Sequence, residues 1–217
     1  MTERFAPPLP PSYLPPRTAQ IGRLIAVEGT SSAGKSTVVA ILAARLRAQR
    51  LHVVPYPFSE TSEINDDLAA LPQLAFYLSG LSHAADHVRG VLATSSMVTD
   101  RYGISVIANH AAVHQIPLET VRAFARPVLS YLPAPEVTVY LRTGEAALRE
   151  RMRSKADLTR SDRQMLDAPG LLGRLCAHYE TLISQDPSAL WIDTDRLSPL
   201  QIVDAILGHL AGRADEH

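Results

Sequence analysis

The chain has 217 residues, of which 46% are hydrophobic and 20% charged, as in a globular protein that buries a core. Its formal net charge of −1 provides no overall basic field, which argues against a general nucleic-acid-binding protein. A single cysteine excludes an internal disulfide and favours a reducing, cytoplasmic location, and no apolar run approaches the roughly 18 residues of a membrane span.

Prolines dominate the N-terminus of the chain. Residues 1–18 contain six of them, which is incompatible with the interior of a helix or a sheet. We therefore predict a flexible, Pro-rich tail over 1–18 and one domain over 19–213. The alternative for the tail is an arm that binds a partner or a strap across a dimer.

A phosphate-binding pattern follows the first predicted strand, residues 22–28. The next nine residues match G-x-x-x-x-G-K-[ST] without a mismatch. Its glycines let the backbone approach an anion closely, and the N-terminus of the following helix favours negative charge. Lys35 brings a charge to the outer phosphates, and Ser36 offers a hydroxyl to Mg²⁺. We assign the whole loop to ATP binding: Gly29, Thr30, Ser31, Ser32, Ala33, Gly34, Lys35, Ser36 and Thr37.

Strand and helix patterns alternate over the rest of the chain. The first half predicts a helix over 35–50, a strand over 51–54, a loop over 55–63, helices over 64–79 and 82–94, a strand over 96–100, and helices over 103–112 and 118–131. The second half predicts a strand over 136–141, a helix over 145–153, a polar connector over 154–163, a helix over 170–185, a strand over 190–193 and a last helix from Ser198. This alternation predicts an α/β protein with a five-stranded parallel sheet and helices on both faces.

An aspartate ends the predicted strand 96–100, about sixty residues after the loop. A carboxylate in this place can hold Mg²⁺, usually through water, although it could also cap the next helix. Together with the loop, Asp100 indicates a P-loop NTPase fold that uses ATP and Mg²⁺. Ser36 and Asp100 are the candidate metal residues.

Basic side chains gather near residue 155. Phosphoryl transfer needs positioning and positive charge at the transferring group, so we predict a lid over about 149–165. Its catalytic candidates are Arg153, Arg160 and Arg163. The remaining basic residues, Arg149, Arg151 and Lys155, are interpreted as solvated charges on a helix.

The sequence resembles the thymidylate kinase family of nucleoside monophosphate kinases over about 21–210. Four pieces carry the resemblance: Glu28 to Thr37, Tyr56-Pro57 with Ser62-Glu63-Ile64, Asp100-Arg101-Tyr102 with Ser105 and Ala108, and Arg149 to Arg163. Two family features are missing, because the loop positions 30–33 hold neither an acid nor an arginine, and 81–87 lack the arginine that reaches the thymine base.

The resemblance implies roles for residues on the acceptor side. Arg101 holds the acceptor's phosphate and counts among the catalytic residues with Lys35, and Tyr102 lines the acceptor sugar site. Tyr56 or Phe58 packs against the base, and His83 is the candidate substitute for the missing arginine. The resemblance also implies a homodimer packed through helices.

These observations predict a kinase that moves the γ-phosphoryl group of ATP to a small-molecule acceptor, a nucleoside monophosphate such as dTMP. The first alternative is a kinase of a free hydroxyl, on a deoxynucleoside, an antibiotic or another metabolite, with Glu60 or Glu63 as general base. The second alternative is a regulatory protein that uses a nucleotide as a switch. No nucleic-acid or membrane partner is expected.

Overall fold

The computed structural model describes residues 9–15, 19–61, 65 and 67–214. Within them, strands form one sheet in the order β2–β3–β1–β4–β5, and every neighbouring pair is parallel. The strands are β1 Leu24–Glu28, β2 Gln49–His52, β3 Met97–Asp100, β4 Val137–Arg142 and β5 Ala189–Asp193. The predicted α/β class and five-stranded parallel sheet are therefore confirmed.

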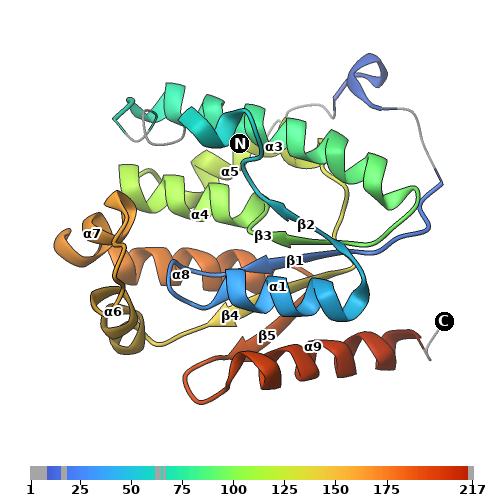
Figure 1. The fold of residues 1–217 in the computed structure, drawn as a ribbon. Helices are drawn as coiled ribbons and strands as arrows, with labels where there is room; N and C mark the ends of the chain where they lie inside the picture. The colour runs from blue at the N-terminus through green and yellow to red at the C-terminus, as the bar shows by residue number, and fades with distance from the viewer. Residues whose placement is uncertain (1–8, 16–18, 62–64, 66, 215–217) are drawn as a thin grey trace.

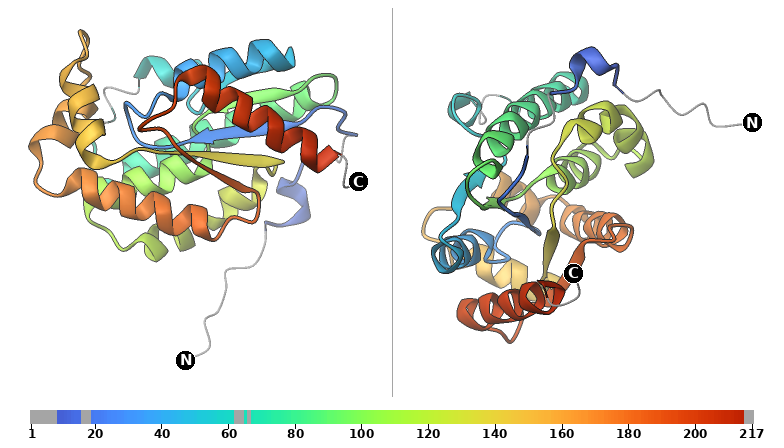
Figure 2. Two further views of the ribbon diagram at one scale, coloured as in Figure 1. Left: turned by 90° about the horizontal axis from the view of Figure 1, so that it is seen from below. Right: turned by 90° about the vertical axis from the view of Figure 1, so that its right-hand side faces the viewer.

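Helices cover both faces of the sheet, as predicted. Figure 2 shows α1 and α9 on one side, and α3, α4, α5 and α8 on the other. Their bounds are α1 Lys35–Leu46, α3 Ala70–Leu92, α4 Gly103–His114, α5 Leu118–Tyr131, α8 Leu171–Ser184 and α9 Pro199–Ala214. Two shorter helices, α6 Glu145–Arg153 and α7 Arg160–Asp167, lie at the end of the molecule toward which the strands point (Figure 1). Short 3₁₀ turns occur at Pro11–Tyr13 and Phe58–Thr61.

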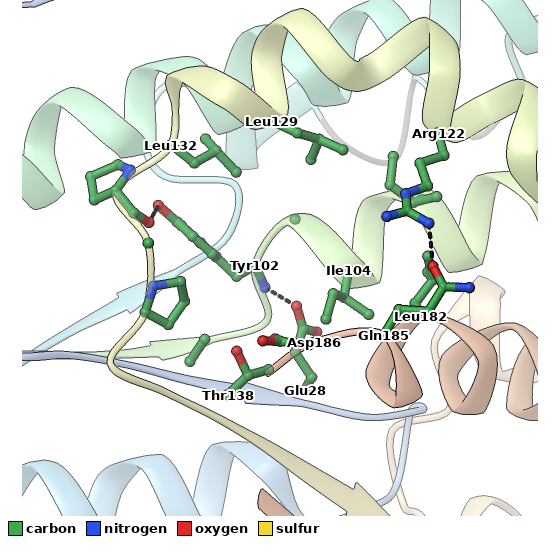
Figure 3. A pocket seen from close by; sticks show the side chains of 16 residues that line it. Glu28, Tyr102, Ile104, Arg122, Leu129, Leu132, Thr138, Leu182, Gln185 and Asp186 are labelled. Carbon is green, nitrogen blue, oxygen red and sulfur yellow. Dashed lines mark hydrogen bonds between the residues drawn. The ribbon is translucent and has the colours of Figure 1, made fainter. Parts of the chain in front are cut away.

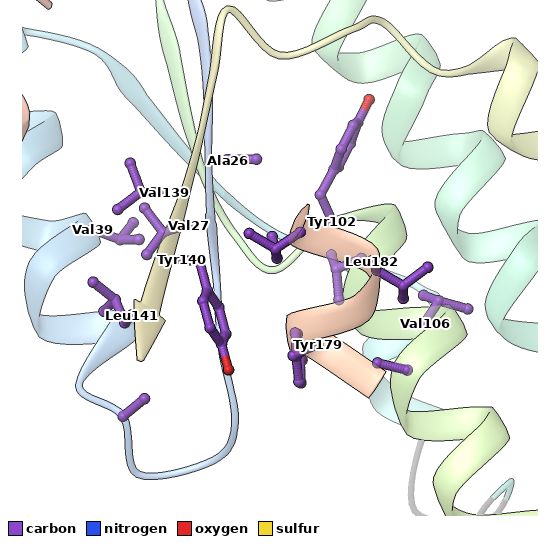
Figure 4. Packing of buried hydrophobic residues seen from close by; sticks show 14 of the residues in the cluster. Ala26, Val27, Val39, Tyr102, Val106, Val139, Tyr140, Leu141, Tyr179 and Leu182 are labelled. Atoms are coloured by element: carbon purple, nitrogen blue, oxygen red, sulfur yellow. The ribbon is translucent and has the colours of Figure 1, made fainter. Parts of the chain in front are cut away.

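The centre of the sheet is buried on both faces. All residues of β1 and β3 are buried, as expected for parallel strands between two helical layers. Large side chains fill the space between the sheet and α8, where the Tyr140 and Tyr179 rings stack with centroids 5.7 Å apart (Figure 4). The loops at the carboxyl ends of the central strands are therefore supported by a rigid, close-packed core.

The prediction of two helices over 64–79 and 82–94 is wrong, because one helix, α3, runs through both. Glycine is a poor helix former, yet α3 continues through Gly80. In the structure Gly80 is buried, and a Cβ at this position would lie 3.5 Å from both Val54 and Phe58. This glycine therefore provides room for neighbouring side chains inside a continuous helix.

Three other boundaries differ from the predictions. The first helix ends at Leu46 rather than 50, because Arg47 takes a left-handed conformation with φ 51°. The second strand pairs over Gln49–His52 instead of 51–54, in register with β3. The predicted connector 154–163 contains the start of α7, where Thr159 and Asp162 form a capping box.

The predicted tail lies largely outside the described residues, which include only 9–15 of it. Among the helices that the structure describes, none is long and apolar enough to cross a membrane.

A buried histidine makes the stability of the fold depend on pH. His110 of α4 is 5% exposed, and its Nδ1 has no hydrogen-bond partner among the described residues. Its ring lies 4.5 Å from that of His114, whose Nε2 is 2.7 Å from Oε1 of Gln73. Burial, and then the charge of His114, lower the pKa of His110 to about 4.

We expect acidification to destabilise the protein through His110. The unfolded chain binds this proton near pH 6.5 but the folded protein only near pH 4, so the stabilisation present above pH 6.5 is lost as pH falls between these values. The urea midpoint should therefore decrease from pH 7 to pH 5, and His110→Leu should reduce that decrease. His87→Leu, at an exposed position of α3, should retain it. An identical decrease in His110→Leu and the wild type would contradict this expectation.

Candidate active site

The loop between β1 and α1 requires glycine at its two ends. Gly29 has φ 146°, and a Cβ there would lie 3.0 Å from the carbonyl oxygen of Leu141. Gly34 caps α1 with φ 94°. Between them, Ser32 carries a buried hydroxyl without a hydrogen-bond partner among the described residues. An unpaired hydroxyl beside a helix N-terminus fits the oxygen atoms of a bound phosphate.

Lys35 is a buried cation at the first position of α1. Its side chain folds back so that Nζ donates to the carbonyl oxygen of Thr30 at 2.6 Å. Burial, and then the positive charge of Arg101, lower the pKa of Lys35 well below its usual value, while Asp100 and Glu28 act in the opposite direction. A polyphosphate bound in the loop would stabilise this poorly solvated ammonium group.

Ser36 and Asp100 join the loop helix to the end of β3. The Ser36 hydroxyl donates to Oδ2 of Asp100 at 2.5 Å, and Oδ1 of Asp100 is buried without a hydrogen-bond partner in the described part of the chain. Hydroxyl and carboxylate oxygens are ligands that suit Mg²⁺. The described residues contain no group of three or more His, Cys, Asp or Glu side chains that could hold a metal.

Arg101 is held beside the loop in an unusual backbone conformation. Its φ is 70°, and its N–H donates to the carbonyl oxygen of Val27 at 2.9 Å. Its Nη1 donates to the Gly29 carbonyl at 3.2 Å, the Ser105 hydroxyl at 3.4 Å and the Tyr179 hydroxyl at 3.1 Å. A left-handed arginine costs roughly 1–2 kcal/mol, so these contacts must offset that strain.

Glu28 fixes the turn that carries Arg101. This last residue of β1 is fully buried, and its Oε1 accepts hydrogen bonds from the backbone N–H groups of Tyr102 at 2.9 Å and Ser105 at 3.3 Å. The Ser105 hydroxyl donates to Oε2. Burial raises the pKa of Glu28, and the Ser105 hydroxyl and the Arg101 charge oppose this rise. Since no side chain at the N-cap of α4 satisfies its first N–H groups, Glu28 takes this role.

Asp162 connects the candidate lid, residues 149–165, to the phosphate loop. This carboxylate is fully buried; Oδ1 accepts from the Ser31 hydroxyl at 2.5 Å, and Oδ2 accepts from Lys155 Nζ at 2.9 Å. Lys155 Nζ also lies 3.5 Å from Oγ of Ser31. Burial favours the neutral form, but the hydrogen bonds from Ser31, Lys155 and Thr159 lower the pKa of Asp162 to about 2. Lys155, interpreted from its sequence context as a solvated charge, lies at the loop instead.

The arginines predicted to be catalytic occupy the outside of the candidate lid. Arg153 and Arg163 are exposed, and Arg160 forms an exposed ion pair with Asp67, with Nη1 and Oδ2 2.8 Å apart. Two of the arginines interpreted as solvated are instead bound to neighbours. Nη2 of Arg151 donates to the Thr194 carbonyl at 3.1 Å, and Arg149 pairs with Glu145.

Among the described acceptor-side candidates between β2 and β3, only Phe58 is partly buried, whereas His83, Tyr56 and Glu60 are exposed. The Phe58 ring packs against Phe76 of α3, with centroids 5.6 Å apart, and lies 5.8 Å from the ring of His83. The other candidate base, Glu63, lies outside the described residues.

Tyr102 points into the protein interior beneath α5. Its hydroxyl donates to the carbonyl oxygen of Pro133 at 3.1 Å, and burial raises its pKa. The ring lines a cavity of about 280 Å³ between the sheet, α4, α5 and α8, in which Glu28 is also visible (Figure 3). In this structure Tyr102 therefore supports the turn after β3, and its role at an acceptor sugar rests on the resemblance.

Several neighbours of the site carry no signal that singles them out in the sequence. Tyr179 reads as one apolar position of a helix, yet its hydroxyl lies 2.7 Å from that of Ser105 and contacts Arg101. His52 ends β2 in register with Asp100. Tyr179 belongs to α8 and His52 to β2, so only the packing of these elements around the sheet brings them close to the loop.

Comparison with protein families and solved structures agrees with the fold and the phosphate loop described above. The model of the thymidylate kinase family matches residues 27–206. Thymidylate kinase from Candida albicans is structurally similar, with a TM-score of 0.73 at 17% identity over 92% of this chain and 96% of that one. Deoxyadenosine kinase from M. mycoides, described with the products dCMP and dCDP, gives a TM-score of 0.67 at 18% identity over 87% and 99%. No curated protein sequence matches the chain.

The structural likeness confirms the predicted P-loop fold, and the family model covers the loop, the Asp100-Arg101-Tyr102 turn and the candidate lid. The chain therefore belongs to the thymidylate kinase family and is a nucleotide kinase.

Proposed function

We propose that the protein transfers the γ-phosphoryl group of ATP, with Mg²⁺, to a nucleoside monophosphate such as dTMP. The observation that carries this proposal is the guanidinium of Arg101. Its Nη1 is engaged by three oxygen atoms, whereas no described residue forms a hydrogen bond with its Nε or Nη2. These two nitrogens form one edge of the planar group, and such an edge suits bidentate binding of a phosphate.

The other residues have complementary tasks. Lys35 and the loop N–H groups bind the β- and γ-phosphates, and Ser36 and Asp100 hold Mg²⁺, which when bound neutralises charge on the phosphate oxygens. The acceptor phosphate is already ionised at neutral pH, so Arg101 has only to position it. No general base is needed for this acceptor.

A free hydroxyl acceptor is the second candidate, and a charge pattern favours it. The chain has no Lys or Arg between Arg50 and Arg89, the segment that contains the acceptor-side loop and most of α3. The same segment holds five acids: Glu60, Glu63, Asp66, Asp67 and Asp86. This segment therefore supplies no Lys or Arg that could join Arg101 in binding the doubly charged phosphate of a nucleoside monophosphate. A neutral or cationic hydroxyl compound fits this side, with Glu60 or Glu63 as its general base.

A panel of acceptors separates these functions. The protein is incubated with Mg·ATP and deoxynucleoside monophosphates, deoxynucleosides, or aminoglycoside- and chloramphenicol-like alcohols, and ADP release is measured. Dependence on a monophosphate supports the first proposal. Turnover confined to unphosphorylated alcohols supports the second candidate and contradicts the first. ATP binding without any acceptor-dependent turnover would instead favour a regulatory nucleotide-binding protein.

Replacing Arg101 by alanine is expected to affect a phosphorylated acceptor most. We expect kcat/KM for the monophosphate to fall by about 10²-fold, because a bidentate charged contact is lost. Tyr179→Phe, which removes one hydroxyl that holds Nη1, should cause a smaller loss in the same parameter. Arg45→Met, at the far end of α1, is the matched control. Unchanged KM and kcat for the acceptor in Arg101→Ala would show that this residue does not bind it.

A further inference from the structure

The two lysines of this chain both lie at the phosphate loop. Of its 21 Lys and Arg residues only Lys35 and Lys155 are lysines, and they lie 120 positions apart in the sequence. The structure brings both to the phosphate loop: Nζ of Lys35 contacts Thr30, and Nζ of Lys155 lies 3.5 Å from Oγ of Ser31. A lysine presents a compact charge on a flexible stem, which suits a narrow anion site better than the wide guanidinium of arginine does.

Lys155 is held in this position by a buried anchor. Asp162 has no solvent-exposed surface, whereas the Lys155 side chain is 32% exposed. The carboxylate is fixed independently by the Ser31 hydroxyl and by the backbone N–H of Thr159. The ammonium group is thus oriented by a rigid partner while part of it remains available to a ligand. Ser31 has a short side chain, which lets the lysine approach the loop.

Positive charge converges on the loop from both sides. Arg101 and then Lys155 act on Lys35 as like charges, and both lower its pKa. The carboxylates of Asp100 and Glu28 act on Lys35 in the opposite direction. Cations held this close are favoured by anions beside them, and the phosphates of a nucleotide bound by the loop would add further negative charge.

We propose that Lys155, positioned by Asp162, is the cation of the candidate lid that contacts the transferring phosphate. This inference rests on the proposed function, and it assigns to a lysine the task that the charge pattern alone assigns to Arg153, Arg160 and Arg163. In the structure Arg160 is paired with Asp67, and Arg153 and Arg163 face solvent. Asp162 acts through Lys155 and is a positioning residue.

A chemical probe can test the contact without measuring turnover. An acyl phosphate of ATP, with the acyl group on the γ-phosphate, reacts with an amine close to that phosphate. The lysine nitrogen attacks the acyl carbon, an amide forms, and ATP leaves with the cleaved oxygen. Because the chain has two lysines, mass spectrometry identifies the modified side chain without ambiguity.

We expect the probe to acylate both Lys35 and Lys155, and excess ATP to protect both. Urea-unfolded protein gives the background rate of each lysine. Labelling of Lys35 alone, with Lys155 at its background rate, would overturn the inference while leaving the proposed function intact. Labelling of neither lysine above background would count against ATP binding at the loop, and so against both.

Kinetics of Lys155 variants provide the second test. Lys155→Met should lower kcat by about 10²-fold and change KM for ATP much less, because the contact strengthens as charge develops on the phosphate. Lys155→Arg should recover part of kcat, since it restores the charge. Arg45→Met should stay within about twofold of the wild type, the range expected for a distant surface charge. A kcat for Lys155→Met equal to that of Arg45→Met would overturn the proposal.

A double-mutant cycle tests the role of Asp162. If this residue acts by positioning Lys155, then Asp162→Asn should lower kcat in the wild-type background but add little to Lys155→Met. Additive losses would show that Asp162 acts independently of Lys155. If no acceptor supports turnover by the wild type, the proposed function fails, and the labelling result still decides whether Lys155 lies at the phosphate.

Discussion

Lys35→Met is expected to lower phosphoryl transfer by at least about 10³-fold with every acceptor, which is the largest effect of any substitution considered. Methionine keeps the apolar stem of the buried side chain but removes the charge that we propose binds the outer phosphates. Transfer is measured as ADP release under saturating Mg·ATP. A variant that retains a tenth of wild-type kcat would contradict the role of Lys35.

The same substitution should make the protein more stable. The ammonium group of Lys35 is buried, with the Thr30 carbonyl as its hydrogen-bond acceptor, and burial is the main cause of its lowered pKa. Removing a poorly solvated charge should therefore raise the thermal unfolding midpoint in the absence of nucleotide. Higher stability together with lost activity would distinguish a functional lysine from a structural one, and a lower midpoint would contradict this reasoning.

Glu28→Ala is expected to have the largest effect on stability, about 3 kcal/mol of unfolding free energy. The substitution leaves the N–H groups of Tyr102 and Ser105 buried without an acceptor, and it removes a negative charge from the N-terminus of α4. The urea midpoint, analysed at constant m-value, measures the change.

Glu28→Gln is the matched control for this prediction. Its amide oxygen can still accept one of the backbone hydrogen bonds, and its volume is nearly the same, so the loss should be clearly smaller than in Glu28→Ala. Because Glu28 fixes the turn after β3, both variants should also raise KM for the acceptor. A loss below about 1 kcal/mol in Glu28→Ala would show that the turn holds without this carboxylate.

The sequence predicted the sheet well where strands are buried on both faces. Apolar runs marked β1, β3 and β4 within a residue or two. The edge strand β2 was misplaced because its Gln49, Arg50 and His52 are exposed and give no apolar signal. The segment 154–163 was predicted as a polar connector because of its many charges. The start of α7 within it was missed, although Thr159 and Asp162 have the spacing of a capping box.

The candidate site was predictable to the extent that its residues form local motifs. The loop pattern and the acid at a strand end identified Ser36 and Asp100, and the adjacency of β1 and β3 then explains their hydrogen bond. The contact of Tyr179 with Arg101 and that of Asp162 with Ser31 join segments with no shared pattern. Charge type alone could not distinguish the lid arginines, on the surface, from Lys155, at the loop.

Transfer of label from [γ-³²P]ATP to an acceptor is the most direct test of phosphoryl transfer by this protein. With Mg²⁺ and dTMP, we predict that label appears in dTDP in an amount equal to the ADP formed, and that Lys35→Met forms none. Label found only in inorganic phosphate, with dTMP and with every other acceptor of the panel, would contradict the account.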